Sequence, residues 1–356
     1  MTSESETRRR DFYKKLPKVE LHRHLEGSLR LSTMIDIAKL HKLDLPVDDV
    51  EKFRALVQVM ADEPYTFQNF LSKFATLRHF YQSPEAISRI AYETIEDAAS
   101  DNVQYMELRF TPVALTRIRD YPLGEAMDWV IASAAEASER YGIEVRLIAS
   151  VNRHEPVELA EEVVALAVER KGRGIIGLDL AGGEADFPGE EFAPLFKSAK
   201  EAGMRIIIHA GEWGGPELIR LAVDKLYAER IGHGVRVMED PDVVALTRAS
   251  QIPFEVCPTS NYQSGVVTDL RQHPLPAMIA AGLNVTVNTD DPGISQITLS
   301  DEYRVCESQL GIPPAGLKDL ILNAAWVSFL PEQEKSELIG RLSAQLDKLI
   351  PTELEY

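Results

Sequence analysis

The chain has 356 residues, of which 45% are apolar and 26% are charged, a composition that is typical of a folded globular protein and not of a disordered one. Its 56 acidic and 38 basic side chains give a net charge of -18, which repels nucleic-acid phosphates and anionic membrane surfaces. No apolar run approaches the roughly 20 residues that a membrane span needs, and the polar start, Met1–Arg10, lacks the apolar core of a signal peptide. We therefore expect a cytoplasmic protein that binds neither nucleic acid nor membranes.

The only two cysteines of the chain are Cys257 and Cys306. Two isolated cysteines cannot form a disulfide framework or a thiolate zinc site. Any metal in this protein must therefore be held by histidines and carboxylates.

Short runs rich in Val, Ile and Leu alternate with helical patterns along the chain. The eight runs that we interpret as strands are 19–25, 103–110, 143–151, 174–180, 205–210, 229–233, 253–257 and 283–288. Helical patterns such as 191–202 and 242–250 lie between them, and the second of these follows Asp240 as a predicted N-cap and Pro241 as the predicted first helical residue. Eight alternating strand and helix units predict an α/β fold, a closed (β/α)8 barrel of the TIM type.

The chain is about a hundred residues longer than the roughly 250 that are typical of such a barrel. Most of the excess follows the first strand, in a segment of about 27–102 with predicted helices at 69–81 and 85–100. A segment that leaves the C-terminal end of a barrel strand lies over the barrel mouth, so we interpret this insertion as a helical lid. The alternative is a helical layer packed on the outside of the barrel. We expect one domain over residues 17–356, preceded by a tail of residues 1–16.

Polar residues stand at the ends of four of the predicted strands. These residues are His22, His24, His209, His233, Asp290 and Asp291. Each alone has an ordinary interpretation, because a single histidine is more often a core residue and paired carboxylates are usually a solvated turn. The C-terminal ends of barrel strands meet at one rim, however, so these side chains are expected to converge. Three imidazoles and one carboxylate would suit a zinc ion, which takes three or four N and O ligands and leaves a position for water in a catalytic site.

Six segments in chain order resemble the adenosine deaminases of the metal-dependent amidohydrolase group. They are Val19–Gly27, Gly177–Glu184, His209–Glu212, Arg230–Gly234, Cys257–Asn261 and Asn288–Pro292. The resemblance extends from residue 17 to about residue 330 and implies one Zn²⁺ or another divalent ion. The metal ligands that it implies are His22, His24, His209 and Asp290. The fourth strand carries no lysine of the kind that bridges two metals in related enzymes, which favours a single ion.

The resemblance also implies the roles of the residues around the ion. Glu212 would be the acid beside purine N1, and His233 would orient and activate the attacking water. Asp291 would bond to that water and to N7, and the backbone N–H of Gly182 would contact N3. The chemistry agrees, because attack at C6 breaks the aromatic system and requires a proton at N1, which a protonated Glu212 can supply.

The implied reaction is the zinc-dependent hydrolytic deamination of adenosine, and of 2′-deoxyadenosine, to inosine products and ammonia, with a purine nucleoside as the small-molecule partner. Glu26 departs from the pattern, because these enzymes usually carry Asp there, in contact with the ribose 5′-hydroxyl, whereas enzymes that act on free adenine tend to carry Glu. Free adenine, or a 5′-modified adenosine such as aminodeoxyfutalosine, is therefore an alternative substrate. A catalytically silent purine-binding module is the alternative from a different class.

Overall fold

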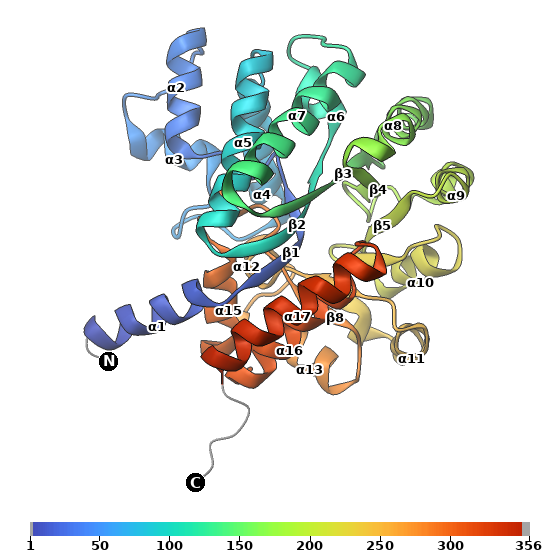
Figure 1. Cartoon of the computed structure of the whole chain (residues 1–356). Coiled ribbons are helices and arrows are strands. Elements are labelled where there is room, and N and C mark those ends of the chain that lie inside the picture. Colours follow the sequence, from blue (N-terminus) through green and yellow to red (C-terminus); the bar gives the residue numbers. More distant parts are fainter. Residues whose placement is uncertain (1–2, 351–356) are drawn as a thin grey trace.

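Eight parallel strands, paired in chain order, form the sheet at the centre of the molecule (Figure 1). The strands are β1 (Lys18–His24), β2 (Val103–Phe110), β3 (Glu144–Asn152), β4 (Ile175–Ala181), β5 (Arg205–Ala210), β6 (Arg230–His233), β7 (Phe254–Val256) and β8 (Val285–Val287). All eight predicted strands are present in this computed structural model, which describes residues 3–350. The predicted α/β fold, a (β/α)8 barrel, is confirmed.

The first and last strands meet at a short seam. Beyond the end of β8, Asp290 forms an isolated parallel bridge with Arg23 of β1. The His24 N–H donates to the Asp290 carbonyl at 2.8 Å, and the Asp290 N–H donates to the His22 carbonyl at 3.0 Å. This seam ties the residue after β8 to the end of β1.

Helices surround the strands (Figure 1). Those that follow β2 to β5 are α6 (Pro112–Thr116), α7 (Leu123–Tyr141), α8 (Val157–Glu169), α9 (Ala193–Glu201) and α10 (Pro216–Asp224). Those that follow β6 and β7 are α11 (Pro241–Ser250), α12 (Pro258–Gln263) and α13 (Leu275–Ala280). Those after β8 are α14 (Pro292–Ser295), α15 (Leu299–Ser308), α16 (Pro314–Trp326) and α17 (Glu332–Leu349). Asp240 caps α11 as predicted, since its carboxylate accepts from the N–H of Asp242 at 2.8 Å.

The long segment after β1 contains four helices. They are α2 (Leu31–His41), α3 (Val50–Val57), α4 (Phe67–Leu77) and α5 (Pro84–Ser100). Helix α4 ends at Leu77, earlier than predicted, and a turn of 3-10 helix continues to Phe80. Lys73 of α4 anchors this helix to the rest of the insertion, because its ammonium donates to the Ala55 carbonyl and to the Glu63 carboxylate, each at 2.7 Å.

The segment interpreted from its polar sequence as a tail contains helix α1 (Ser3–Lys15). Its last turns pack on the protein, where Tyr13 and Leu16 are buried. Arg9 and Tyr13 both donate to the carboxylate of Glu307 on α15. Burial of Tyr13 and Leu16 and the bonds to Glu307 thus hold the C-terminal part of this charged segment against the protein. Among the described residues, no helix is long and apolar enough to span a bilayer.

Candidate metal centre and active site

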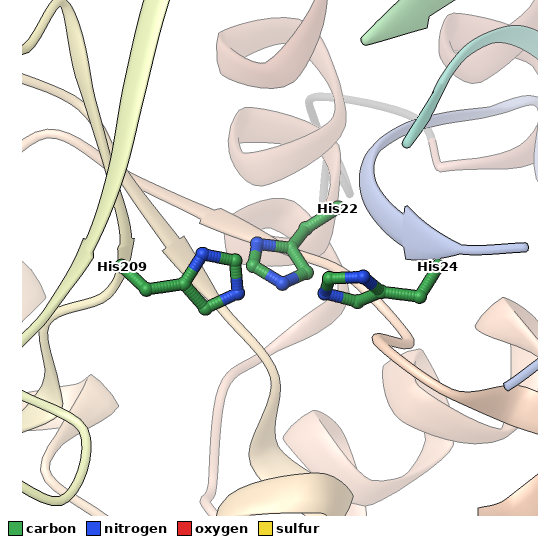
Figure 2. A group of neighbouring side chains, drawn as sticks. All are labelled: His22, His24 and His209. Atoms are coloured by element: carbon green, nitrogen blue, oxygen red, sulfur yellow. The ribbon is translucent and has the colours of Figure 1, made fainter. Parts of the chain in front are cut away.

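Three imidazoles from two strands converge at the C-terminal end of the barrel. His22 and His24 lie on β1 and His209 lies on β5, and Figure 2 shows their rings side by side. The ring centroid of His22 is 5.2 Å from that of His24 and 4.8 Å from that of His209. One nitrogen of each ring lies within 4.8 Å of the others, a spacing that suits ligands of a single ion.

The carboxylate of Asp290 lies against the same imidazoles. Its Oδ1 is 3.2 Å from Nε2 of His22 and 3.3 Å from Nε2 of His24. Its Oδ2 accepts a hydrogen bond from the Ser260 hydroxyl at 2.7 Å. The backbone of Asp290 is left-handed, with φ of 66°, and the seam with β1 holds it in that conformation. The four predicted ligands are therefore brought together.

Carboxylates behind the imidazoles fix which ring nitrogen faces the site. Nδ1 of His22 donates to Glu255 and Nδ1 of His209 donates to Asp179, each at 2.8 Å. Because Nδ1 carries the proton, Nε2 of each ring presents a lone pair to the site. Within residues 3–350, Nε2 of His22 has no hydrogen-bond donor, yet it faces a carboxylate oxygen of Asp290. Two acceptors at this distance repel each other unless a proton or a metal cation lies between them, and three imidazoles with one carboxylate are a donor set that fits a divalent metal ion.

A buried charge network supports the carboxylates. Glu255 accepts from the guanidinium groups of Arg109 and Arg230, each at 2.6 Å, and Arg230 also donates to Glu107. Burial opposes the ionised form of Glu255, but the two arginines hold its pKa well below its usual range. Burial likewise opposes ionisation of Asp179, whose pKa is nevertheless kept far below normal by His209 and Arg109. Both carboxylates therefore stay ionised and keep accepting from the imidazoles.

Sequence reasoning assigned no role to Glu255, Asp179 or Arg109. The available signal was a charged residue within an otherwise apolar strand, as at Phe254-Glu255-Val256. All three side chains have no solvent exposure. Such residues need partners, and the partners come from other strands that the sequence alone does not specify.

Glu212 lies just after β5 and is 5% exposed. Burial raises its pKa well above the ordinary value, and the negative charges of Asp290 and Glu184 add to this effect. Its Oε2 is 3.7 Å from Nε2 of His233 at the end of β6. The protonated form of Glu212 is therefore favoured, and its carboxyl group faces His233.

A hydrogen bond on the side of the ring away from Glu212 fixes the orientation of His233. The Asn261 amide donates to its Nδ1 at 3.1 Å. Burial lowers the pKa of His233 well below its ordinary value, so the ring is neutral. With Nδ1 accepting, Nε2 carries the hydrogen and directs it toward Glu212 and toward Asp290, whose Oδ2 is 3.9 Å away.

Asp291 has a different environment from its neighbour Asp290. A Cβ at position 27 would lie 1.8 Å from Oδ1 of Asp291, so Gly27 is required for their close approach. This Oδ1 is buried and has no hydrogen-bond partner among the described residues. Burial, together with the charges of Asp290 and Glu26, raises the pKa of Asp291 well above normal. Asp291 therefore offers a proton or a lone pair to a ligand.

A cavity of about 250 Å³ opens beside these groups, near the lower end of the size range of small-molecule sites. The predicted site residues that line it are His24, Glu26, Gly182, His209, Glu212, His233, Asp290 and Asp291. Phe70, Leu71 and Phe74 of α4 also line it, as does Trp213. Part of the segment after β1 therefore covers the site.

One end of the cavity contains Glu26, which was predicted to contact the substrate, together with Tyr81 and Arg78, which were not predicted. Oε1 of Glu26 accepts from the Thr111 N–H at 2.5 Å. In the described part of the chain, Oε2 of Glu26 and the hydroxyl of Tyr81 are both buried without a partner. Burial raises the pKa of Glu26 to about 7 and that of Tyr81 well above its ordinary value, although the charge of Arg78 beside them opposes both shifts. This end of the cavity suits hydroxyl groups of a ligand.

The fold and the site together define a (β/α)8 barrel of the enzyme type, with a histidine and carboxylate group at the C-terminal ends of its strands that could hold a metal ion. A family model described as adenosine deaminase matches residues 17–345. The chain belongs to the adenosine deaminase family and is a hydrolase that acts on C–N bonds.

Two relatives named adenosine deaminase resemble most of the chain. That of Klebsiella pneumoniae strain 342 is 38% identical over 329 residues, which are 92% of this chain and 98% of the relative. That of Serratia proteamaculans is 39% identical over 325 residues, which are 91% of this chain and 97% of the relative.

Solved structures resemble the fold closely. The adenine deaminase of Arthrobacter aurescens superposes with a TM-score of 0.86 at 32% identity, covering 93% of this chain and 99% of that one. A zinc-bound amidohydrolase from Burkholderia ambifaria superposes with a TM-score of 0.87 at 27% identity, covering 96% of this chain and 93% of that one.

Proposed function

We propose that the protein hydrolyses the C6 amino group of adenosine, and of 2′-deoxyadenosine, to give inosine products and ammonia. One observation carries the proposal: the imidazoles and Asp290 converge on one point beside the buried acid Glu212, inside a single cavity. The adenosine deaminase relatives, matched over nearly their whole length, support a nucleoside as the substrate.

We propose that one zinc ion is held by His22, His24, His209 and Asp290. When bound, such an ion lowers the pKa of water from about 15.7 to about 7 and so supplies a nucleophile at neutral pH. The protein prepares the ligands for this task through Glu255 and Asp179, which keep the imidazole lone pairs directed at the site.

Glu212 supplies the proton that the purine ring needs. Attack of water oxygen at C6 moves an electron pair of the ring onto N1, and the protonated Glu212 carboxyl transfers its proton to that nitrogen. The raised pKa of Glu212 favours the protonated carboxyl that this step needs.

His233, Asp291 and Gly182 position the reactants. The Nε2–H of His233 orients the attacking water; one proton of that water completes the leaving ammonia, and the other replaces the proton that Glu212 gave to N1. Asp291, whose pKa is raised, donates to N7 and also bonds the water. The N–H of Gly182 contacts N3.

Other residues that line the cavity are proposed to contact the ribose of the substrate. Glu26 and Tyr81 offer their unpartnered oxygens to the 5′ side of the ribose. Phe70, Leu71 and Phe74 of α4 form the apolar cover that keeps bulk water out, which makes this helix a lid within one domain of residues 17–356.

The test is ammonia release by purified, zinc-loaded protein, with kcat/KM compared for adenosine, adenine and 5′-substituted adenosines. We expect adenosine to give the highest value. No release from any of these compounds would refute the deaminase assignment, and a higher value for adenine would move the substrate to the free base.

The role of Glu212 as the proton donor to N1 can be tested with a variant. Glu212→Gln should lower kcat by about 10² to 10⁴, because the amide cannot transfer a proton, while purine binding is retained. Glu217→Gln is a matched control, since Glu217 is exposed in the first turn of α10 and should keep normal turnover. Normal turnover of Glu212→Gln would remove Glu212 from its role.

A further inference from the structure

The carboxylate of Glu184 accepts four successive backbone hydrogen bonds. Its Oε2 accepts from the N–H of Gly211 at 2.8 Å. Its Oε1 accepts from the N–H groups of residues 212, 213 and 214 at 2.6, 2.5 and 2.8 Å. The side chain is 1% exposed, so one buried anion satisfies every backbone donor of the segment 211–214.

The segment 211–214 is shaped around this carboxylate. Gly211 is left-handed, with φ of 70°, and a Cβ on Gly214 would come within 3.2 Å of the Glu184 carboxyl carbon. The opposite side of the segment is also held, because Arg236 donates to the Trp213 carbonyl at 2.9 Å. The backbone of Glu212 is therefore fixed on both sides.

Glu184 comes from the turn after β4, two residues beyond Gly182. The same short turn thus presents Gly182 to the cavity and holds the backbone of Glu212 across the gap between β4 and β5. In the proposed reaction Gly182 contacts N3 and Glu212 contacts N1 of the same purine ring.

We infer that Glu184 is a positioning residue for deamination: its carboxylate holds the segment 211–214 so that the Glu212 carboxyl meets N1 while Gly182 meets N3. This inference rests on the proposed function. Glu184 contacts no reacting atom and acts entirely through Glu212.

Glu184→Gln is the first variant. The amide oxygen of the new side chain still accepts hydrogen bonds from backbone N–H groups of the segment 211–214. Its NH₂ group, however, faces a backbone N–H that it cannot accept from, and the negative charge of the carboxylate is lost. We expect kcat to fall by about 10²-fold, the effect of a displacement of about 1 Å, with KM within about threefold and zinc content unchanged. Glu302→Gln is the control, because Glu302 is equally buried and accepts only one backbone N–H, that of Thr259, at 3.0 Å.

Two measurements separate positioning from a general loss of structure. The inhibition constant of 1-deazaadenosine, which has C–H in place of N1, should be unchanged in Glu184→Gln, because this analogue never uses the Glu212 proton. The double variant with Glu212→Gln should be no slower than Glu212→Gln alone. The inference would be overturned if the kcat losses of Glu184→Gln and Glu212→Gln multiplied in the double variant. It would also be overturned if the inhibition constant of 1-deazaadenosine rose in Glu184→Gln as kcat fell.

Amide hydrogen exchange tests the same point without turnover. Exchange of a peptide containing residues 211–214 should be at least tenfold faster in Glu184→Gln than in the wild type and unchanged in Glu302→Gln. Unchanged exchange, or normal kcat in Glu184→Gln, would refute the inference. If the wild type released no ammonia from any adenosine, the proposed function would fail, and exchange would still decide whether Glu184 holds the segment.

Discussion

The bond between Asp179 and His209 offers a test of how the metal ligands are prepared. Asp179→Asn keeps an oxygen for Nδ1 of His209, which donates at 2.8 Å, but removes the charge. The imidazole then becomes a weaker ligand, and Arg109, whose guanidinium is 3.5 Å from Asp179, loses one of two carboxylate partners. Loss of such an outer carboxylate lowers metal affinity by about 10- to 100-fold, which is about 1.4 to 2.7 kcal/mol.

The assay is competition for Zn²⁺ between the metal-free protein and a chelator of known affinity, at constant pH. Ser150→Ala is the control, because the Ser150 hydroxyl donates to the other oxygen of Asp179 at 3.0 Å and its removal leaves the charge in place. We expect the control to bind zinc within about threefold of the wild type, because the ionised carboxylate that faces His209 remains in place. An affinity of Asp179→Asn within twofold of the wild type would refute the reasoning.

Three further predictions follow from buried oxygens. Tyr81→Phe should raise KM for adenosine several-fold and leave that for 5′-deoxyadenosine unchanged; equal effects on both substrates would place the hydroxyl elsewhere. Glu26→Asp should change the ratio of kcat/KM between adenosine and adenine, and a constant ratio would exclude contact with the sugar. Burial raises the pKa of Glu302 from 4.5 to about 8, so the folded state retains a proton that the unfolded state loses, and stability falls between these pH values. The Tm of Glu302→Gln minus that of the wild type should therefore increase as the pH rises from 5 to 8. A Tm difference that stays constant over this range would contradict the prediction.

The barrel and the ligand set were predictable because their signals are local. Each strand is a short apolar run, and His209 stands directly at the end of one such run. The symmetry of a barrel then places all strand ends on one rim, so residues as distant as His22 and Asp290 could be expected to meet.

The supporting groups could not be predicted in the same way. Arg109 and Glu255 are 146 positions apart, and nothing in either strand specifies the other as its partner. Tyr81 follows the last turn of an inserted helix, where no periodic pattern shows which side chains face the cavity. Pairing of buried charges is a property of the assembled interior, and a single sequence does not contain it.

The seam between β1 and Asp290 has a consequence for biosynthesis. His22 and His24 leave the ribosome well before Asp290, their partner in backbone bonding, because Asp290 lies more than 260 positions later in the chain. A nascent chain that has not reached residue 290 therefore has neither the seam nor the proposed carboxylate ligand. The proposed four-ligand centre therefore cannot form until residue 290 has been made and has paired with β1.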